Sequence, residues 1–220
     1  MDAATTITGA VPPGHPGRAQ ADARAALRAT TAAAHARLHR HPAFAALAEG
    51  WISLPAHQAL LARLHGFHAP LETRLLAANP AQDPALRMSE RRHAGRLRMD
   101  LVDLGLADAA IDALPVAGEG LLSAPADDMG HFLGCLYVRE GSTLGGRVLA
   151  RALDPLLGAG TERGRRFLAG NGVNEGDLWR DLCVALEESA AMGHLPGMVA
   201  GARAIFAGLE AWLDGLDADA

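Results

Sequence analysis

Lysine is absent from the sequence: all twenty basic residues among its 220 residues are arginine. A lysine that forms a Schiff base therefore cannot exist, which excludes pyridoxal-phosphate enzymes and class I aldolases. A P-loop is excluded for the same reason, because its lysine must reach the phosphates of a bound nucleotide. The missing side chain thus removes several large groups of enzymes.

Cysteine is scarce, and Cys135 and Cys183 lie far apart within apolar helical patterns. Two such residues provide neither a disulfide framework nor a C-x-x-C zinc or redox site, so we expect a reducing cytoplasm. An excess of positive charge is also lacking, since the formal net charge is -5. A nucleic-acid partner is not expected, because binding phosphates requires a basic surface.

The amino-terminal segment contains neither a basic region nor an apolar run, and it carries an early Asp2, so a secretory signal is not expected. We predict a flexible tail over residues 1–20 and one domain over residues 21–216. A chain of 220 residues with 50% hydrophobic content can bury one substantial core without requiring a second.

Strand signals are missing, because β-branched residues are sparse and no Asn-Gly turn joins two alternating apolar runs. Alanine and leucine dominate instead, which predicts an all-α fold. Pro70 lies inside one predicted helix and should kink it, because its ring clashes with the carbonyl of Gly66. The predicted helices cover about residues 22–40, 53–78, 89–104, 123–157, 176–190 and 196–213.

The first predicted helix carries Leu27, Thr31, Ala34, His35 and Leu38 on one stripe. This spacing is typical of an amphipathic helix whose stripe faces the core. We therefore expect His35 to point inward.

The longest predicted helix carries a glycine stripe: Gly130, Gly134, Tyr137, Gly141 and Gly145 are separated by intervals of three or four residues. Such residues share one helical face, which here is nearly bare of side chains. Each interior glycine costs roughly 0.5–1 kcal/mol relative to alanine, so the four cost about 2–4 kcal/mol together. Some other interaction must compensate.

Several interpretations of the glycine stripe are possible. Close packing of another helix is the simplest. A membrane span is excluded by the charges of Arg139, Glu140, Arg147 and Arg151, and GSTLGG is not a phosphate loop. The remaining interpretation is a flat ligand lying against exposed backbone, with a bend at the Gly145-Gly146 pair.

Histidine is the residue that could bind such a ligand through a metal. On apolar stripes, the candidates are His35, His65, His68 and His131, and a hydrogen-bonded core histidine is the alternative for each. His39 is expected at a helix end and His93 on a solvated face. No cluster with the spacing of a metal site is predicted.

Four segments resemble one protein family in their order and approximate spacing. They read LRATTAAAHARLH, RRHAGRLRMDLVDLGL, GCLYVREGSTLGGRVL and FLAGNGVNEGDLWRDLCVALE. The chain resembles the bacterial haem oxygenases, most closely the group encoded with bacteriophytochromes. The resemblance implies an all-helical fold with haem between a proximal helix, which bears the iron ligand, and a kinked, glycine-rich distal helix.

The resemblance also implies roles for individual residues. It implies that His35 is the proximal ligand of the haem iron and that the distal positions are Gly141, Ser142, Gly145 and Gly146. Tyr137 matches a position that contacts a haem propionate, with a core aromatic residue as the alternative. His65, Arg92 and Trp179 fall near positions that order distal water, with a core histidine, a solvated charge and a core aromatic residue as the alternatives.

The activity implied by the resemblance is oxidative cleavage of haem b, which is then both substrate and prosthetic group. O2 and electrons from a donor such as ferredoxin and its reductase, or ascorbate in vitro, would yield biliverdin, carbon monoxide and ferrous iron. The biliverdin would supply a bacteriophytochrome, with iron acquisition as the alternative purpose. A haem carrier or sensor without turnover, and a helical scaffold without haem, are the competing hypotheses.

A run of five arginines lies between Arg87 and Arg98, in RMSERRHAGRLR. A plain solvated face is one interpretation. The other is an electropositive patch that attracts an acidic electron donor or anchors propionates.

Overall fold

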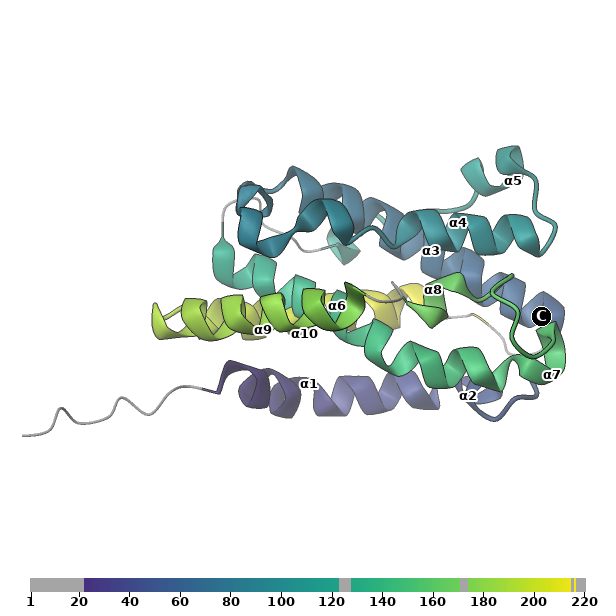
Figure 1. Cartoon of the computed structure of the whole chain (residues 1–220), viewed down its shortest axis with the longest axis horizontal. Helices are drawn as coiled ribbons and strands as arrows, with labels where there is room; N and C mark the ends of the chain where they lie inside the picture. The colour runs from purple at the N-terminus through teal and green to yellow at the C-terminus, as the bar shows by residue number, and fades with distance from the viewer. Residues whose placement is uncertain (1–21, 123–127, 171–173, 215, 217–220) are drawn as a thin grey trace, which may run out of the picture.

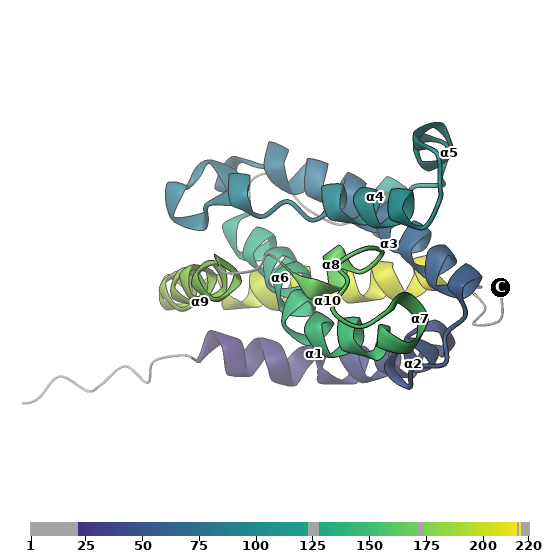
Figure 2. The same cartoon turned by 45° about the vertical axis from the view of Figure 1, so that its right-hand side comes forward.

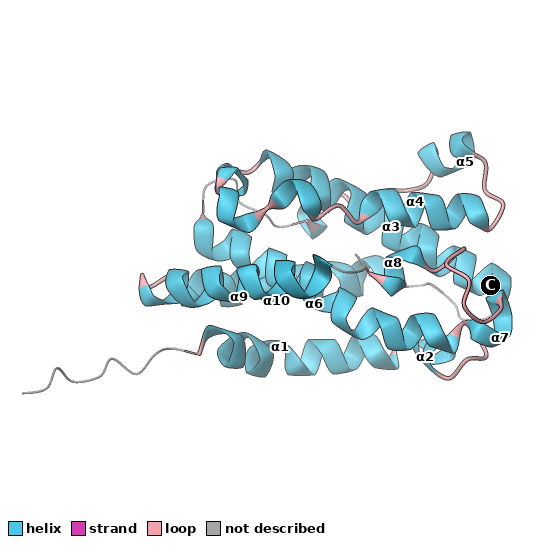
Figure 3. Ribbon diagram, viewed as in Figure 1, coloured by secondary structure: helices cyan, strands magenta, loops and turns pink. Residues whose placement is uncertain are grey.

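A computed structural model describes residues 22–122, 128–170, 174–214 and 216. Within this part of the chain every regular element is a helix and no strand occurs (Figure 3), so the predicted all-α class is confirmed. The helices are α1 (Ala23–Arg40), α2 (Pro42–Ala48), α3 (Leu54–Ala77), α4 (Ala94–Asp103), α5 (Asp108–Asp112), α6 (Met129–Ala152), α7 (Asp154–Leu157), α8 (Arg166–Ala169), α9 (Glu175–Ala191) and α10 (Leu195–Leu213), with 3-10 turns η1 (Asn79–Gln82), η2 (Pro84–Leu86), η3 (Met88–Glu90) and η4 (Glu119–Leu121).

Some sequence predictions concern residues outside the described part. They are the tail over residues 1–20 and the turn signals at Ser123, Pro125 and Asn171-Gly172. The domain bounds 21–216 likewise stay a prediction.

The helices lie in three layers (Figures 1 and 2). Helices α3, α4 and α5 form one outer layer, α1 and α2 the opposite one, and α6, α9 and α10 lie between them. Helix α10 packs most extensively against α6 and also contacts α1 and α3. One apolar cluster joins α1, α3, α6, α9 and α10, and a second joins α2, α3, α4 and α8. Among the described helices, none is both long and apolar enough to cross a membrane.

Local signals fix the ends of the first helices. Asp22 caps α1 by accepting a hydrogen bond from the Ala25 amide, and the helix ends before Pro42, which begins α2. Ser53 caps α3 in the same way, by accepting from the Ala56 amide. The predicted bounds of α1 and α3 are therefore confirmed to within a residue or two.

Pro70 lies inside α3, as predicted, and the helix continues through it. Because proline has no amide hydrogen, the Gly66 carbonyl loses its partner within the helix. That carbonyl instead accepts a hydrogen bond of 2.8 Å from the Ala117 amide. A Cβ on Gly66 would collide with the Pro115 carbonyl oxygen, so glycine permits the close approach of this link.

The helix predicted from residue 89 begins only at Ala94, so its predicted start is wrong. The backbone leaves the helical path because the buried Arg91 side chain turns inward and donates to the Leu86 carbonyl oxygen. The carboxylate of Glu72, on α3, then accepts from the amides of His93 (2.6 Å) and Ala94 (3.2 Å). A residue remote in sequence thus satisfies the first amides of α4.

Helix α6 begins at Met129, after the extended N-cap Asp128, and ends at Ala152, while residues 154–157 form the separate helix α7. The prediction of one helix over 123–157 is therefore wrong at both ends. The buried guanidinium of Arg165 donates to the carbonyl oxygens of Ala150 and Gly158 and to Asp154. These hydrogen bonds satisfy carbonyls near the end of α6 and hold the turn that follows.

Helix α6 has continuous helical structure between its ends and changes direction along its length (Figure 2). It contacts α9 and α10 as well as α2, α7 and α8. The bend predicted at Gly145-Gly146 stays a prediction as to its position.

Candidate functional site

The glycine stripe of α6 divides into two parts with different neighbours. A Cβ on Gly134 would collide with the Met198 carbonyl oxygen of α10, and one on Gly130 would lie 2.6 Å from the His194 carbonyl oxygen. These two glycines allow the backbones of α6 and α10 to approach closely. For this part of the stripe, helix packing is the correct interpretation.

The second part of the stripe is open. A Cβ on Gly145 would meet no described atom within 4 Å, and one on Gly141 would meet only the Trp179 ring, at 3.8 Å. Val148, one turn further along, is 70% exposed. Gly146 faces elsewhere, because its Cβ would collide with the Leu168 carbonyl oxygen of α8. The uncovered part of the stripe therefore consists of Gly141 and Gly145, with the exposed Val148 beyond them, and Gly146 allows α8 to pack closely against α6.

One face of α1 carries two arginines and His35. Arg24, Arg28 and His35 are separated by four and seven residues and therefore share a helical face. Burial raises the pKa of Tyr137, on α6, while the nearby charges of Arg28 and Arg24 act in the opposite direction. The charges of those two arginines thus act on Tyr137, while His35, further along the same face, has its ring beside Phe206 of α10.

His35 itself is exposed, which corrects the prediction that it points inward. Leu27 and Thr31 of the predicted stripe are buried, but His35 lies on the flank of that stripe. Its ring contacts Phe206 edge-on at 6.4 Å, and its Nε2 lies 3.3 Å from the Nε2 of His39. Partial burial and the neighbouring His39 lower the pKa of His35, which favours a neutral ring.

Two further predicted residues lie beside the open stripe. The Trp179 ring, on α9, lies 5.8 Å from the Tyr137 ring, so these aromatic residues form a wall next to Gly141. Ser142 is exposed, and its hydroxyl donates a 2.7 Å hydrogen bond to the Arg139 carbonyl oxygen. The structure therefore brings Tyr137, Trp179 and Ser142 together with Gly141.

His65 and Arg92 are placed differently. His65 is half-buried on α3, where burial and the charge of Arg98 lower its pKa. Arg92 is exposed on the link before α4. Neither residue is among the atoms within 4 Å of a Cβ built on Gly141 or Gly145. The structure thus gives no direct contact of either residue with the open stripe, and their water-ordering role stays a prediction.

The other histidine candidates have structural surroundings. His68 is fully enclosed, and its burial, with the charges of His93 and Arg139, lowers its pKa to about 3. It therefore remains neutral, as expected of a core histidine. His131 is half-buried in the first turn of α6, where its amide donates to Asp128.

A buried ionic cluster lies behind the open stripe, around Glu140. One Glu140 oxygen accepts from Arg91 at 3.2 Å, and the other accepts from the Nε2 of His93 at 3.1 Å. Burial by itself would raise the pKa of Glu140, but the His93 hydrogen bond and the charges of Arg139 and Arg91 lower it to about 2. The carboxylate next to Gly141 is therefore ionised.

Arg139 completes the cluster. Its side chain is 1% exposed, with Nε 3.4 Å from a Glu140 oxygen and one terminal nitrogen 3.8 Å from a Glu72 oxygen. None of the three nitrogens of its side chain makes a hydrogen bond to a described residue. The charges of two carboxylates, Glu72 and Glu140, balance those of two guanidinium groups, Arg91 and Arg139. Burying these charges without such a balance would be costly.

Sequence reasoning missed this cluster. His93 was expected on a solvated face, but it is 2% exposed, so that prediction is wrong. The available signal was the Arg139-Glu140 pair, two charges that directly follow the apolar run of α6 and precede Gly141. Their partners come from the α3 helix and the link before α4, which the sequence could not connect to α6.

The run of five arginines is neither a free patch nor a plain solvated face. Arg91 is fully buried, Arg87 pairs with Glu90 and Asp181, and Arg98 pairs with Asp108 and Asp112. Carboxylates thus neutralise most of the charge that the sequence places there.

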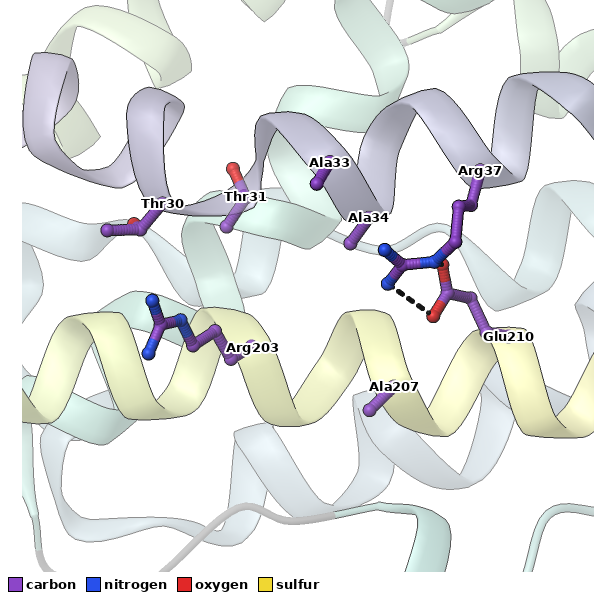
Figure 4. Close-up of a pocket in the computed structure, with 8 residues that line it drawn as sticks. All are labelled: Thr30, Thr31, Ala33, Ala34, Arg37, Arg203, Ala207 and Glu210. Carbon is purple, nitrogen blue, oxygen red and sulfur yellow. Dashed lines mark hydrogen bonds and ion pairs between the residues drawn. The ribbon is translucent and has the colours of Figure 1, made fainter.

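A pocket of about 300 Å³ lies between α1 and α10 (Figure 4), and His35 is not among its lining residues. Arg37 and Glu210 form a bidentate pair at its edge, with distances of 2.9 and 3.0 Å. Arg203 and Thr30 also line it. Among the described residues, no group of three or more histidine, cysteine, aspartate or glutamate side chains could hold a metal ion.

Comparisons with known proteins agree with the fold. A family model described as heme oxygenase matches residues 21–212. The structure is similar to the crystal structure of heme oxygenase-1 from the cyanobacterium Synechocystis sp. PCC6803 in complex with heme, with a TM-score of 0.64 and 14% identity over 88% of this chain and 93% of that chain. No curated protein matches the chain by sequence. Because the family model matches nearly the whole described chain, the protein belongs to the haem oxygenase family.

Proposed function

We propose that the protein binds haem b between His35 of α1 and the Gly141–Gly145 surface of α6, and cleaves it to biliverdin, carbon monoxide and ferrous iron. Two observations support the proposal: His35 is an exposed imidazole, and no described backbone lies within 4 Å of a Cβ built on Gly141 or Gly145, apart from the backbone of α6 itself. The Synechocystis relative was crystallised with heme, which supports haem as the ligand.

His35 fits the role of iron ligand by its chemistry. Only a neutral imidazole offers a lone pair to a metal, and the pKa of His35 is lowered by burial and by His39. Its position on a long helix held against α9 and α10 fixes its backbone. Haem supplies the redox-active iron and is itself the molecule that is cleaved.

The open glycines fit a flat ligand, because a side chain at either position would occupy the surface against which the ligand lies. Packing against α10 already compensates the cost of Gly130 and Gly134. The helix propensity of the other two glycines, Gly141 and Gly145, still costs about 1–2 kcal/mol relative to alanine, and this cost must be offset. A porphyrin that buries a few hundred Å² at roughly 25 cal/mol per Å² exceeds this cost.

Charged groups at the far end of the same α1 face fit the acidic groups of haem. Arg24 and Arg28 lie near Tyr137, and guanidinium groups pair well with carboxylates. Arg24 also lies 3.6 Å from Glu187, so a propionate would compete with that exposed pair. Tyr137 remains the predicted propionate contact, with Trp179 packed beside it.

The biological setting is part of the proposal. Electrons would come from a donor such as ferredoxin with its reductase, and biliverdin would supply a bacteriophytochrome, or the released iron would be the purpose. The cytoplasm is the proposed location, since both cysteines are free thiols. The proposal assigns no docking role to the arginines between Arg87 and Arg98, because Arg91 is buried and Arg87 and Arg98 are paired with carboxylates.

Turnover tests the proposal directly. Hemin is added to the purified protein, ascorbate is supplied under air, and absorbance spectra are recorded. We expect the Soret band to convert into the spectrum of biliverdin. A haem carrier or sensor would bind hemin and leave the porphyrin intact, and a scaffold without a haem site would give no Soret shift. Either result would contradict the proposal.

The iron ligand is tested by His35→Ala. We expect loss of the histidine-ligated ferric spectrum with helical content retained in circular dichroism, because alanine favours the helix. His39 lies close enough to replace the missing ligand, so the double variant His35→Ala/His39→Ala is measured alongside. His194→Ala, whose Nδ1 lies 2.9 Å from the Ser189 hydroxyl, is the control and should keep the wild-type spectrum. A wild-type spectrum in the double variant would require another ligand.

A further inference from the structure

His35 and His39 form a close pair on the exposed side of α1. They are one helical turn apart, with ring centroids 4.4 Å apart and Nε2 atoms 3.3 Å apart. Neutral imidazoles at this distance share one hydrogen, because one nitrogen must donate and the other accept. The sequence pattern H-x-x-x-H places both side chains on the same side of the helix.

The distance between the two nitrogens matches that of two ligands on one metal ion. A tetrahedral zinc ion binds imidazole nitrogens at about 2.0–2.1 Å, which sets them about 3.3 Å apart. Histidines at positions i and i+4 of a helix bind zinc together for this reason. The separation of the two nitrogens therefore already suits a cation in place of the shared hydrogen.

We propose that His35 and His39 chelate a divalent transition-metal ion such as Zn²⁺ or Cu²⁺, and that this ion and haem exclude each other. Both side chains are exposed, so water completes the coordination. The exposed Arg40 next to His39 opposes a cation, and with two protein ligands the site is weaker than a structural zinc site. Chelation depends only on the pair, whereas exclusion of haem rests on the proposed function.

The metal site is tested on the full chain without haem. Titration calorimetry with ZnCl2 should show one equivalent bound to the wild type, and His39→Ala and His35→Ala should each weaken that binding at least tenfold. His194→Ala is the matched control and should keep the wild-type affinity. Cu²⁺ electron paramagnetic resonance should show two coordinated nitrogens in the wild type and fewer in His39→Ala. Equal zinc affinity in the wild type and His39→Ala would overturn the proposal.

Exclusion is tested by adding hemin in the presence of increasing Zn²⁺. The apparent hemin dissociation constant of the wild type should rise in proportion to free Zn²⁺ above the zinc dissociation constant, and that of His39→Ala should not change with Zn²⁺. Unchanged hemin affinity in zinc-saturated wild type would overturn the exclusion. Failure of hemin to bind without zinc would count against the proposed function and leave the calorimetric result on the metal site unaffected.

Discussion

Among single residues, Glu140 illustrates how a buried charge depends on its partners. Its carboxylate is 6% exposed and lies between Arg91 and His93, with Arg139 beside it. The same cluster contains Glu72, which caps α4. A change at Glu140 should therefore affect the connection of α6 to both α3 and α4.

Glu140→Gln is expected to lower the unfolding free energy by about 3 kcal/mol. The buried guanidinium groups of Arg91 and Arg139 would then face only one carboxylate, that of Glu72. Denaturant unfolding at neutral pH measures the loss. Glu90→Gln is the matched control: Glu90 pairs with Arg87 at the surface, and its loss should change stability far less. Equal effects of the two substitutions would show that the buried cluster does not contribute as inferred.

Single residues also show where periodicity is a limited guide. Successive residues of a helix are rotated by about 100°, so a stripe predicts burial at its centre better than at its edge. Thr31 lies at the centre and is buried, whereas His35 lies at the edge and is exposed. His93 was misplaced for another reason, since its burial depends on Glu140 from a distant helix.

At the scale of elements, α6 uses equally spaced glycines for two purposes. Gly134 allows α10 to approach, and the close contact is reciprocal, because a Cβ on Gly201 of α10 would collide with the His131 carbonyl oxygen. Gly145 faces no described neighbour. The same residue type on one helix therefore supports packing at one end and leaves a bare surface further along.

This difference predicts opposite effects of one substitution. Gly134→Ala should destabilise the protein by about 2–3 kcal/mol, because the added methyl group meets backbone. Gly145→Ala should stabilise the helix by about 0.5–1 kcal/mol and at the same time reduce biliverdin formation. Thermal unfolding and the ascorbate assay measure the two effects. If Gly145→Ala destabilised the fold as much as Gly134→Ala, the surface at Gly145 would be a packing surface.

Helix ends were predictable where the signal is local. Ser53 and Asp22 cap their helices with bonds to residues three positions away, and Gly105 follows α4 with a φ of 97°. The start of α4 was not predictable, because its cap is the Glu72 carboxylate from α3.

At the scale of the whole molecule, Asp100 joins two helices that are distant in the sequence, α4 and α8. Its oxygens accept hydrogen bonds from the amides of Arg166 (2.7 Å) and Phe167 (2.8 Å), which connects α4 to α8. The side chain is fully buried, and burial raises its pKa to about 6 in spite of these bonds. The folded protein therefore binds the Asp100 proton more tightly than the unfolded chain, whose aspartate has the ordinary pKa of 3.8.

The sign of the pH dependence follows. Because the folded pKa is raised, the contribution of Asp100 to stability falls as pH rises from about 4 to about 6, by at most about 3 kcal/mol. Denaturant unfolding at several pH values in this range should show that Asp100→Asn removes this decline. Glu140 has the opposite effect, because its pKa is lowered from the ordinary 4.5 to about 2 in the folded protein. Its contribution to stability is complete above pH 4.5 and is lost as the pH falls toward 2. A constant difference between wild type and Asp100→Asn from pH 4 to 6.5 would contradict the prediction.

The sequence by itself determined the helical class, the bounds of α1, α3, α9 and α10, and the spacing of the glycine stripe, because these depend on residues within a few positions of each other. The resemblance of four segments to one family added His35 as the expected iron ligand. Only the tertiary structure decided which glycines are covered, that His35 is exposed beside His39, and that Arg91 and His93 are buried with Glu140. Those outcomes depend on which helices meet, and the residues that meet are separated by tens of positions in the chain.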